Sequence, residues 1–256
     1  NYDLAYATGS ENSSTRISIG ANNTTGIVKN TGMDKYTLSF NNSTSFFNGA
    51  LKIEPKVLYS AIKDNTTALS GDAGFIGNAV ATALYWNPTQ NVRNADGSFY
   101  VRSNDYLNPS QLIDSYKDHT NTSKLLASVN TSLKLANNLK YNFLMAFENS
   151  NSLRQSQLSP TIQISGSAQS SLVTGTDTFG DPVSTTYYGQ ANVSNMNKFN
   201  KTFEHTLNYT KELNKNINLD VLAGYSLYKY NMNRNSSTVK GFGASQTNLI
   251  DNLQGG

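Results

Sequence analysis

The sequence predicts an all-β chain: an antiparallel, transmembrane β-barrel wall of about eight long strands. Three observations support this class. Apolar and polar residues alternate with period two, tight turns alternate with long connections, and the 256 residues are polar without being strongly charged. Globular strands usually have about 5 or 6 residues, whereas a tilted strand needs roughly 9 to 11 to cross a bilayer. Several alternating segments here reach the longer length, which favours a membrane barrel.

The clearest strand pattern lies at 51–62. Leu51, Ile53 and Val57 share one face, and Lys52 and Lys56 share the other. This is the alternation of a strand with one apolar and one polar face. The same pattern, weaker in the first three segments, predicts strands at 2–8, 16–22, 35–46, 51–62, 125–135, 139–148, 199–213 and 217–227.

The connections between these segments alternate in length. Those at 9–13, 47–50, 136–138 and 214–216 are tight, and Asn48-Gly49 is a pair favoured in hairpin turns. The others are long, at 22–34, 64–122, 152–197 and 231–256. Outer-membrane barrels have short turns on the periplasmic side and long loops outside, so the long segments are predicted to be extracellular loops.

Composition excludes other classes. The chain holds 35 Asn, 30 Ser and 25 Thr, and only 14% of its residues are charged. No apolar stretch reaches the roughly 20 residues that a membrane-spanning helix needs. The net charge of +3 comes without a Lys/Arg cluster, so no nucleic-acid partner is expected. The absence of cysteine excludes thiol catalysis and Cys-ligated zinc.

Motifs typical of catalytic or metal-binding sites are largely absent from the sequence. His119 and His205 have no second His at metal-ligand spacing, so no metal site is expected. The sequence lacks the Gly-x-Ser-x-Gly elbow of serine hydrolases. Around 94–97 the first calcium-ligand position holds Val92, which predicts a turn and not a calcium loop. We therefore predict no catalytic residue, no cofactor and no enzymatic activity.

One stretch of the long 64–122 connection has helical spacing. Phe75, Ile76, Val80 and Leu84 recur near a helical period between 73 and 86. A short loop helix is predicted, which either packs as a small core or forms a docking surface. Loop aromatics that could stack on a substrate or contact a partner are Tyr85, Trp86, Tyr100, Tyr106, Tyr187 and Tyr188.

Short motifs in chain order carry a family resemblance. The order is strand, Gly-containing turn, strand, and a Gly-Ile-Val-Lys loop. The residues are Tyr6-Ala7-Thr8-Gly9-Ser10-Glu11-Asn12, Arg16-Ile17-Ser18-Ile19-Gly20 and Thr25-Gly26-Ile27-Val28-Lys29-Asn30, then Lys35-Tyr36, Asn108-Pro109-Ser110-Gln111-Leu112, Leu133-Lys134-Leu135, Leu139-Lys140-Tyr141 and Thr247-Asn248-Leu249. Together they resemble the barrel region of SusC-like TonB-dependent transporters.

The resemblance implies a fold, a location and partners. Transporters of this family have a 22-stranded barrel, an N-terminal plug, and a SusD-like lipoprotein lid. It follows that residues 1–256 would be about a third of such a barrel, in the outer membrane of a Gram-negative bacterium. Expected partners are outer-membrane lipid, the lid, TonB acting through a plug that this sequence lacks, and an oligosaccharide or peptide substrate. Both ends of the sequence look cut, so we expect it to be part of a longer chain.

Two other readings remain open from the residues. A complete eight-stranded outer-membrane barrel with a structural or adhesive role would explain the strand count, and its first and last strands would pair. A soluble β-sandwich binding module is the other alternative, and it would have short loops at both ends.

Overall fold

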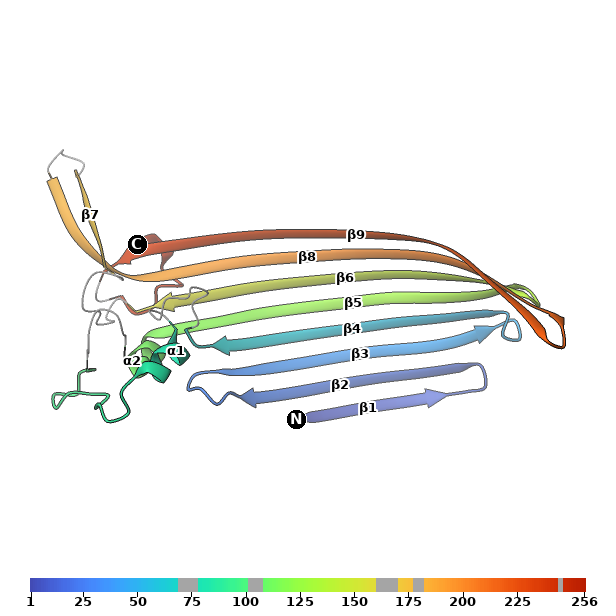
Figure 1. Cartoon of the computed structure of the whole chain (residues 1–256), viewed down its shortest axis with the longest axis horizontal. Coiled ribbons are helices and arrows are strands. Elements are labelled where there is room, and N and C mark those ends of the chain that lie inside the picture. Colours follow the sequence, from blue (N-terminus) through green and yellow to red (C-terminus); the bar gives the residue numbers. More distant parts are fainter. Residues whose placement is uncertain (69–77, 101–107, 160–169, 177–181, 244–245) are drawn as a thin grey trace.

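The structure, a computed structural model, is one antiparallel sheet with two short helices (Figure 1). It describes residues 1–68, 78–100, 108–159, 170–176, 182–243 and 246–256, with the backbone alone for 170–176 and 182–188. In chain order the elements are β1 (Tyr2–Gly9), β2 (Ser13–Thr25), β3 (Gly32–Phe46), β4 (Leu51–Thr66), α1 (Ala79–Tyr85), α2 (Pro109–Ser115), β5 (Tyr116–Ala136), β6 (Leu139–Leu158), β7 (Ser170–Thr176), β8 (Pro182–Asn214), β9 (Ile217–Phe242) and the short 3-10 turn η1 (Leu253–Gly255).

The all-β prediction is confirmed, and each of the eight predicted strands is present. Neighbours in the sheet follow the order β1-β2-β3-β4-β5-β6-β8, and both β7 and β9 pair with β8. The additional strand, β7, has 7 residues and pairs with the beginning of β8. Sequence reasoning missed it because it lies inside a long polar connection.

The two ends of the sheet differ as predicted. At one end, which we call the turn end, tight connections join β1 to β2, β3 to β4, β5 to β6 and β8 to β9 (Figure 1, right). The opposite end, the loop end, carries α1, α2 and the longer connections. In the β3–β4 turn, Phe47, Asn48 and Gly49 all have positive φ, of 53°, 52° and 80°. Glycine adopts such angles at no steric cost, which explains Gly49.

The register places the apolar residues of successive strands opposite one another. One such row runs Tyr6, Ile17, Phe40, Val57, Ala127 and Phe147. We call the face that carries this row the outward face and the other the inward face. The adjacent inward row contains Arg16, Asn41, Lys56 and Ser128. Lipid-facing and lumen-facing residues alternate in this way in membrane barrels.

One ionisable residue interrupts the apolar outward face near its middle. His205 lies opposite Phe143 and Tyr225 in the register. Its Nδ1 is 2.6 Å from the Tyr141 hydroxyl oxygen, and its ring centroid is 4.9 Å from that of Phe143. The hydrogen bond satisfies a polar atom at a depth where an unpaired one would be costly.

The sheet is open. Among the described residues β1 pairs with β2 and β9 pairs with β8, and no pairing joins β1 to β9. Figure 1 shows β1 and β9 at opposite edges. A complete eight-stranded barrel would require these two strands to pair, and a β-sandwich would require two sheets, so the structure contradicts both alternatives.

Several strands extend further than the sequence predicted, which corrects the loop boundaries. The 231–256 loop begins only after Phe242, and the 152–197 loop is strand up to Leu158 and again from Pro182. In the 64–122 loop, β4 continues to Thr66 and β5 begins at Tyr116. Asn, Ser and Thr occupy both faces of these extensions, so alternation disappears while the backbone ladder continues.

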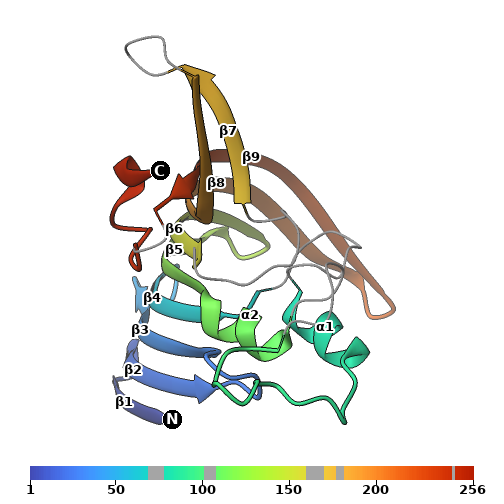
Figure 2. The same ribbon diagram turned by 90° about the vertical axis from the view of Figure 1, so that its left-hand side faces the viewer.

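Separate segments cover the two faces near the loop end. Figure 2 shows the sheet curving around the side that carries α1 and α2. On the outward side, the segment after β9 packs back onto the sheet, where Ala191, Phe242 and Leu249 are fully buried. The Gln157 side chain fixes this segment, because its Oε1 accepts from Leu249 N at 3.0 Å and its Nε2 donates to Thr247 O at 2.9 Å. No helix in the described ranges is long and apolar enough to span a membrane.

The two faces give a paired test on adjacent residues. Val57 faces outward and Leu58 inward, with similar exposed fractions of 37% and 41%. We expect Val57→Lys to lower the free energy of unfolding of the full-length protein by about 2–4 kcal/mol, because a lysine on the lipid face must lose its hydration. Leu58→Lys should cost much less. Denaturant titration in phospholipid vesicles measures both, and equal losses would contradict the assignment of faces.

Candidate functional site

The candidate site is the group of loop residues on the inward side of the loop end. Two helices organise it, and each begins with an asparagine cap. Asn78 Oδ1 accepts from Ala81 N at 3.0 Å at the start of α1, and Asn108 Oδ1 accepts from Ser110 N at 3.0 Å at the start of α2. Pro109 follows as the first residue of α2, a position where its missing N–H and fixed φ are favourable.

A small apolar core attaches the helices to the sheet. Ala68, Ala79 and Leu112 are buried together, and Ile113, Tyr116 and Leu158 pack against them. The helix predicted within 73–86 is confirmed at Ala79–Tyr85, and residues 73–77 lie outside the described ranges. Its contribution to this core fits the packing role predicted as one of its two alternatives.

Asn108 also holds the segment between the helices. Its side chain is 2% exposed, and its Nδ2 donates to Val92 O at 2.8 Å and to Tyr100 O at 3.2 Å. One amide group thus caps α2 and fixes two points of the preceding loop. Sequence reasoning used Asn108 as part of a motif but missed this role. The available signal was an Asn-Pro pair at a helix start.

The turn predicted at 94–97 is confirmed. Gly97 has a φ of 84°, and Asn94 N donates to Ser98 O at 2.8 Å. Asp96 Oδ1 accepts from Ser98 N at 2.9 Å and from its hydroxyl at 2.6 Å, and these hydrogen bonds lower the pKa of the Asp96 carboxyl. The Asp96 carboxylate thus stabilises the turn through hydrogen bonds to Ser98. No group of three or more metal-ligating side chains occurs among the residues that the structure describes.

The structure brings together two of the six candidate aromatics, Trp86 and Tyr100. Tyr85 ends α1 and is 54% exposed. Trp86 packs edge to face against Tyr100, with ring centroids 6.3 Å apart. Tyr106 lies outside the described residues. Tyr187 and Tyr188 lie near the start of β8, where they pair with Ser171 and Ser170, and their side chains are outside the description.

A buried charge pair lies on the inward face beyond the apolar rows. The Asp118 side chain is 1% exposed, and Arg154 binds its carboxylate through Nε at 3.0 Å and through Nη2 at 2.5 Å. The Tyr116 hydroxyl donates to Asp118 Oδ2 at 3.1 Å. A buried carboxylate is costly unless it is paired, so these donors stabilise Asp118 in its buried position.

The same cluster shifts two pKa values. The hydrogen bonds to Asp118 raise the pKa of the Arg154 guanidinium above its ordinary value, and burial raises that of the Tyr116 hydroxyl. Arg154 therefore keeps its positive charge at physiological pH. Half of the Arg154 side chain is exposed, so its positively charged group is partly accessible on the inward side of the loop end. Sequence reasoning missed this pair because its members are far apart in sequence.

Inward-facing aromatics form a further group that the sequence did not identify. Tyr228 and Tyr230 of β9 lie opposite Thr202 and Asn200 and are 61% and 48% exposed. Leu58 and Leu126 lie opposite each other on the same face. These residues give the inward face apolar contact points within a mainly amide and hydroxyl surface.

Comparison with known proteins identifies the fold. No family model and no curated protein matches the chain. Three solved structures that match are described as the RagAB peptide importer in the closed-closed state, the same importer in the open-open state, and the RagAB peptide transporter. Their sequence identities are 13%, 13% and 14% and their TM-scores 0.66, 0.66 and 0.68; each match covers 98% of this chain. The chain spans only 26% of each matched chain. This likeness shows the fold alone: the chain has the fold of one part of the matched barrels.

The role of Asn108 is testable by proteolysis. We expect Asn108→Ala to leave the barrel folded but to make the 87–100 segment more sensitive to protease, because it removes the side-chain hydrogen bonds to Val92 O, Tyr100 O, Ser110 N and Gln111 N. The loss should be about 1–3 kcal/mol locally. Asn87→Ala is the matched control, since the Asn87 side chain accepts only from Thr89 within an exposed turn. Equal cleavage of both variants would contradict the role of Asn108.

Proposed function

We propose that this chain is part of the wall of an outer-membrane transporter that imports an oligomeric nutrient, either a peptide or a glycan. The observation that carries the proposal is the two-faced open sheet, apolar outward and polar inward, in the fold of an importer barrel. A wall of this kind separates lipid from a water-filled or protein-filled lumen. The unpaired edges of β1 and β9 require further strands, because lipid cannot satisfy backbone polar groups.

The proposal includes the partners that the family resemblance implies. A plug inside the barrel would contact the inward face, where Leu58, Leu126, Tyr228 and Tyr230 offer apolar contacts. TonB would act through that plug. A SusD-like lid would lie over the loop end, above α1 and α2. The matched structures are described as the RagAB peptide importer, which supports a peptide cargo.

The inward surface suits a polar, uncharged cargo. Asn and Ser side chains on it, such as Asn130, Ser132 and Asn142, already exchange hydrogen bonds across strands. Amide and hydroxyl groups can bind peptide bonds or sugar hydroxyls without the strong hold of an unlike charge. Of the two cargo classes, the neighbours favour a peptide. Arg154 would then be a candidate contact for a peptide carboxylate at the entrance.

Tyr85 is the sharpest test among the loop aromatics, because it is the most exposed of the three whose side chains are described. We expect Tyr85→Ala in the full-length transporter to lower uptake of the oligomer, or co-purification of the lid, by at least about fivefold, as for an interface anchor. Tyr85→Phe keeps the ring and removes only the hydroxyl, so it measures what the ring alone contributes. Trp86→Ala should act differently, by loosening the packing against Tyr100.

The measurements are uptake of a labelled oligomer by cells and recovery of the lid with the tagged transporter. Protease resistance of the 87–100 segment separates a lost contact from a loosened loop. If Tyr85→Ala leaves uptake and lid recovery unchanged, Tyr85 is not a contact residue, and the role proposed for this loop is wrong.

A further inference from the structure

Two lysines lie side by side on the outward face at the edge of the apolar region. Lys201 of β8 and Lys229 of β9 are direct partners in the register. Opposed residues on one face of an antiparallel pair have Cβ atoms about 4.5–5.5 Å apart, and like charges in this arrangement repel. In the described parts of β6, β8 and β9, each Asp or Glu, namely Glu148, Glu204, Glu212 and Asp220, lies on the inward face. No carboxylate on these strands can neutralise the lysine pair.

The surroundings hold the lysines at the boundary between apolar and polar surface. Lys201 Nζ lies 5.0 Å from the centroid of the Phe199 ring, and the Phe147 and Phe199 rings stack with centroids 6.5 Å apart. One row nearer the turn end, the outward residues are Met145, Phe203 and Leu227. Long lysine stems cover apolar surface while their ammonium groups reach water or headgroups.

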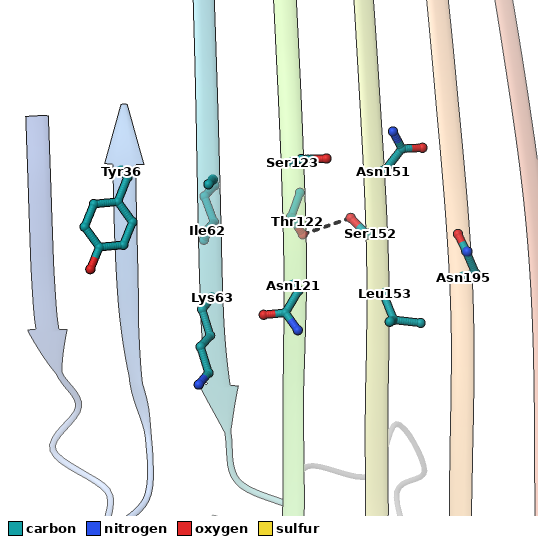
Figure 3. A pocket seen from close by; sticks show the side chains of 11 residues that line it. Tyr36, Ile62, Lys63, Asn121, Thr122, Ser123, Asn151, Ser152, Leu153 and Asn195 are labelled. Carbon is teal, nitrogen blue, oxygen red and sulfur yellow. Dashed lines mark hydrogen bonds between the residues drawn. The ribbon is translucent and has the colours of Figure 1, made fainter. Parts of the chain in front are cut away.

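The rows nearer the loop end are rich in amides. The first outward row beyond the lysines is Asn149, Phe199 and Asn231, and the second is Asn151, Asn197 and Asn233. Asn197 Nδ2 donates to Asn151 Oδ1. Asn151 and Asn195 also line a depression of about 500 Å³, together with Tyr36, Lys63, Asn121 and Leu153 (Figure 3). Along β9 the outward face changes from Leu227 to Lys229 and then to Asn231 and Asn233. Along β8 and β6 the same change from apolar residues to amides occurs after Phe199 and Phe147.

This gradient matches the layers of one kind of molecule. We propose that the outward face of β6, β8 and β9 binds a phosphorylated glycolipid of the surrounding leaflet. The acyl chains contact the apolar rows, a phosphate lies between Lys201 and Lys229, and the sugars contact the asparagine rows. A phosphate bridging the two ammonium groups would remove their repulsion through charge-assisted hydrogen bonds. The side chains stand off the face of the sheet, so a strand pairing with the edge of β9 leaves them accessible.

The site does not depend on what the protein imports. It rests on the proposed outer-membrane location with the loop end outside, and its ligand is lipid A, a phosphorylated glucosamine disaccharide with acyl chains. Phosphatidylglycerol, which has a phosphate but no sugars, distinguishes a glycolipid site from a general anionic-lipid site. Dephosphorylated lipid A tests the contribution of the phosphates.

The experiment measures binding of diphosphoryl lipid A to the purified full-length transporter in detergent by native mass spectrometry. Near an anionic surface each lysine contributes about 1 kcal/mol, so Lys201→Gln or Lys229→Gln should weaken binding about fivefold and the double variant about 25-fold. The double Arg variant keeps both charges and should bind like the native protein. The matched control is Lys198→Gln, because Lys198 lies on β8 three residues away but faces inward, opposite Met232.

The following results would contradict the proposal or one of its parts. Native-like binding by the double Gln variant, or an equal loss in Lys198→Gln, would overturn the site. Binding of dephosphorylated lipid A as tight as that of the diphosphoryl form would remove the role of the phosphates. Equal affinity for phosphatidylglycerol would replace the glycolipid with any anionic lipid. Retention of folded, heat-modifiable barrel on gels shows that each variant is intact, so that a loss of binding refers to the site.

Discussion

The structure depends on one constraint, the unbroken backbone ladder between neighbouring strands. In a bilayer, each unpaired N–H or C=O group costs several kcal/mol, so the strands must stay paired along the full height of the wall. The observed register is continuous from β1 to β6 and on through β8 to β9, with bulges only near the turns at Lys134/Ala136 and Glu212/Asn214. Because side chains alternate with period two, a slip by one residue would exchange the lipid and lumen faces of a strand. The register of the strands thus determines which residues face lipid and which face the lumen.

This constraint explains which parts of the fold the sequence could predict. Where lipid lies on one side, each strand must alternate, as Leu51, Ile53 and Val57 do, and the strand can be recognised from its residues. Beyond the bilayer both faces meet water, and Asn or Ser serves on either side. Residues 231–242 therefore gave no alternation, although β9 continues through them by the same ladder. The missed β7 has the same cause, since neither face of that hairpin needs to be apolar.

The site was less predictable than the barrel wall, because strand pairing, and not a regular spacing in the sequence, brings its residues together. Asp118 and Arg154 are 36 residues apart, and they meet only because the β5–β6 register places Asp118 opposite Ser156 and Arg154 opposite Thr120. Asn108 reaches Val92 across 16 residues through a loop path that no periodicity encodes. Local chemistry was readable, as in the Asn94–Gly97 turn and the Asn-Pro helix start. The aromatic candidates could be named from their residue type, but the contact between Trp86 and Tyr100 became visible only in the fold.

The charge distribution shows a property that the net charge conceals. A total of +3 indicates an almost neutral chain, yet the register sorts the signs by face. In the described strands, Asp34 is the one carboxylate on the outward face, and Asn23 donates a hydrogen bond to it. The other carboxylates of the described strands lie on the inward face, together with most of the lysines. Outward cations sit away from the middle of the apolar region, with Lys63, Lys117, Lys201 and Lys229 toward the loop end and Lys211 toward the turn end. A lysine can extend its ammonium group along its stem to a phosphate layer, whereas a short carboxylate next to phosphates would be repelled. The sorting of charges by face therefore follows from the lipid that the outward face contacts.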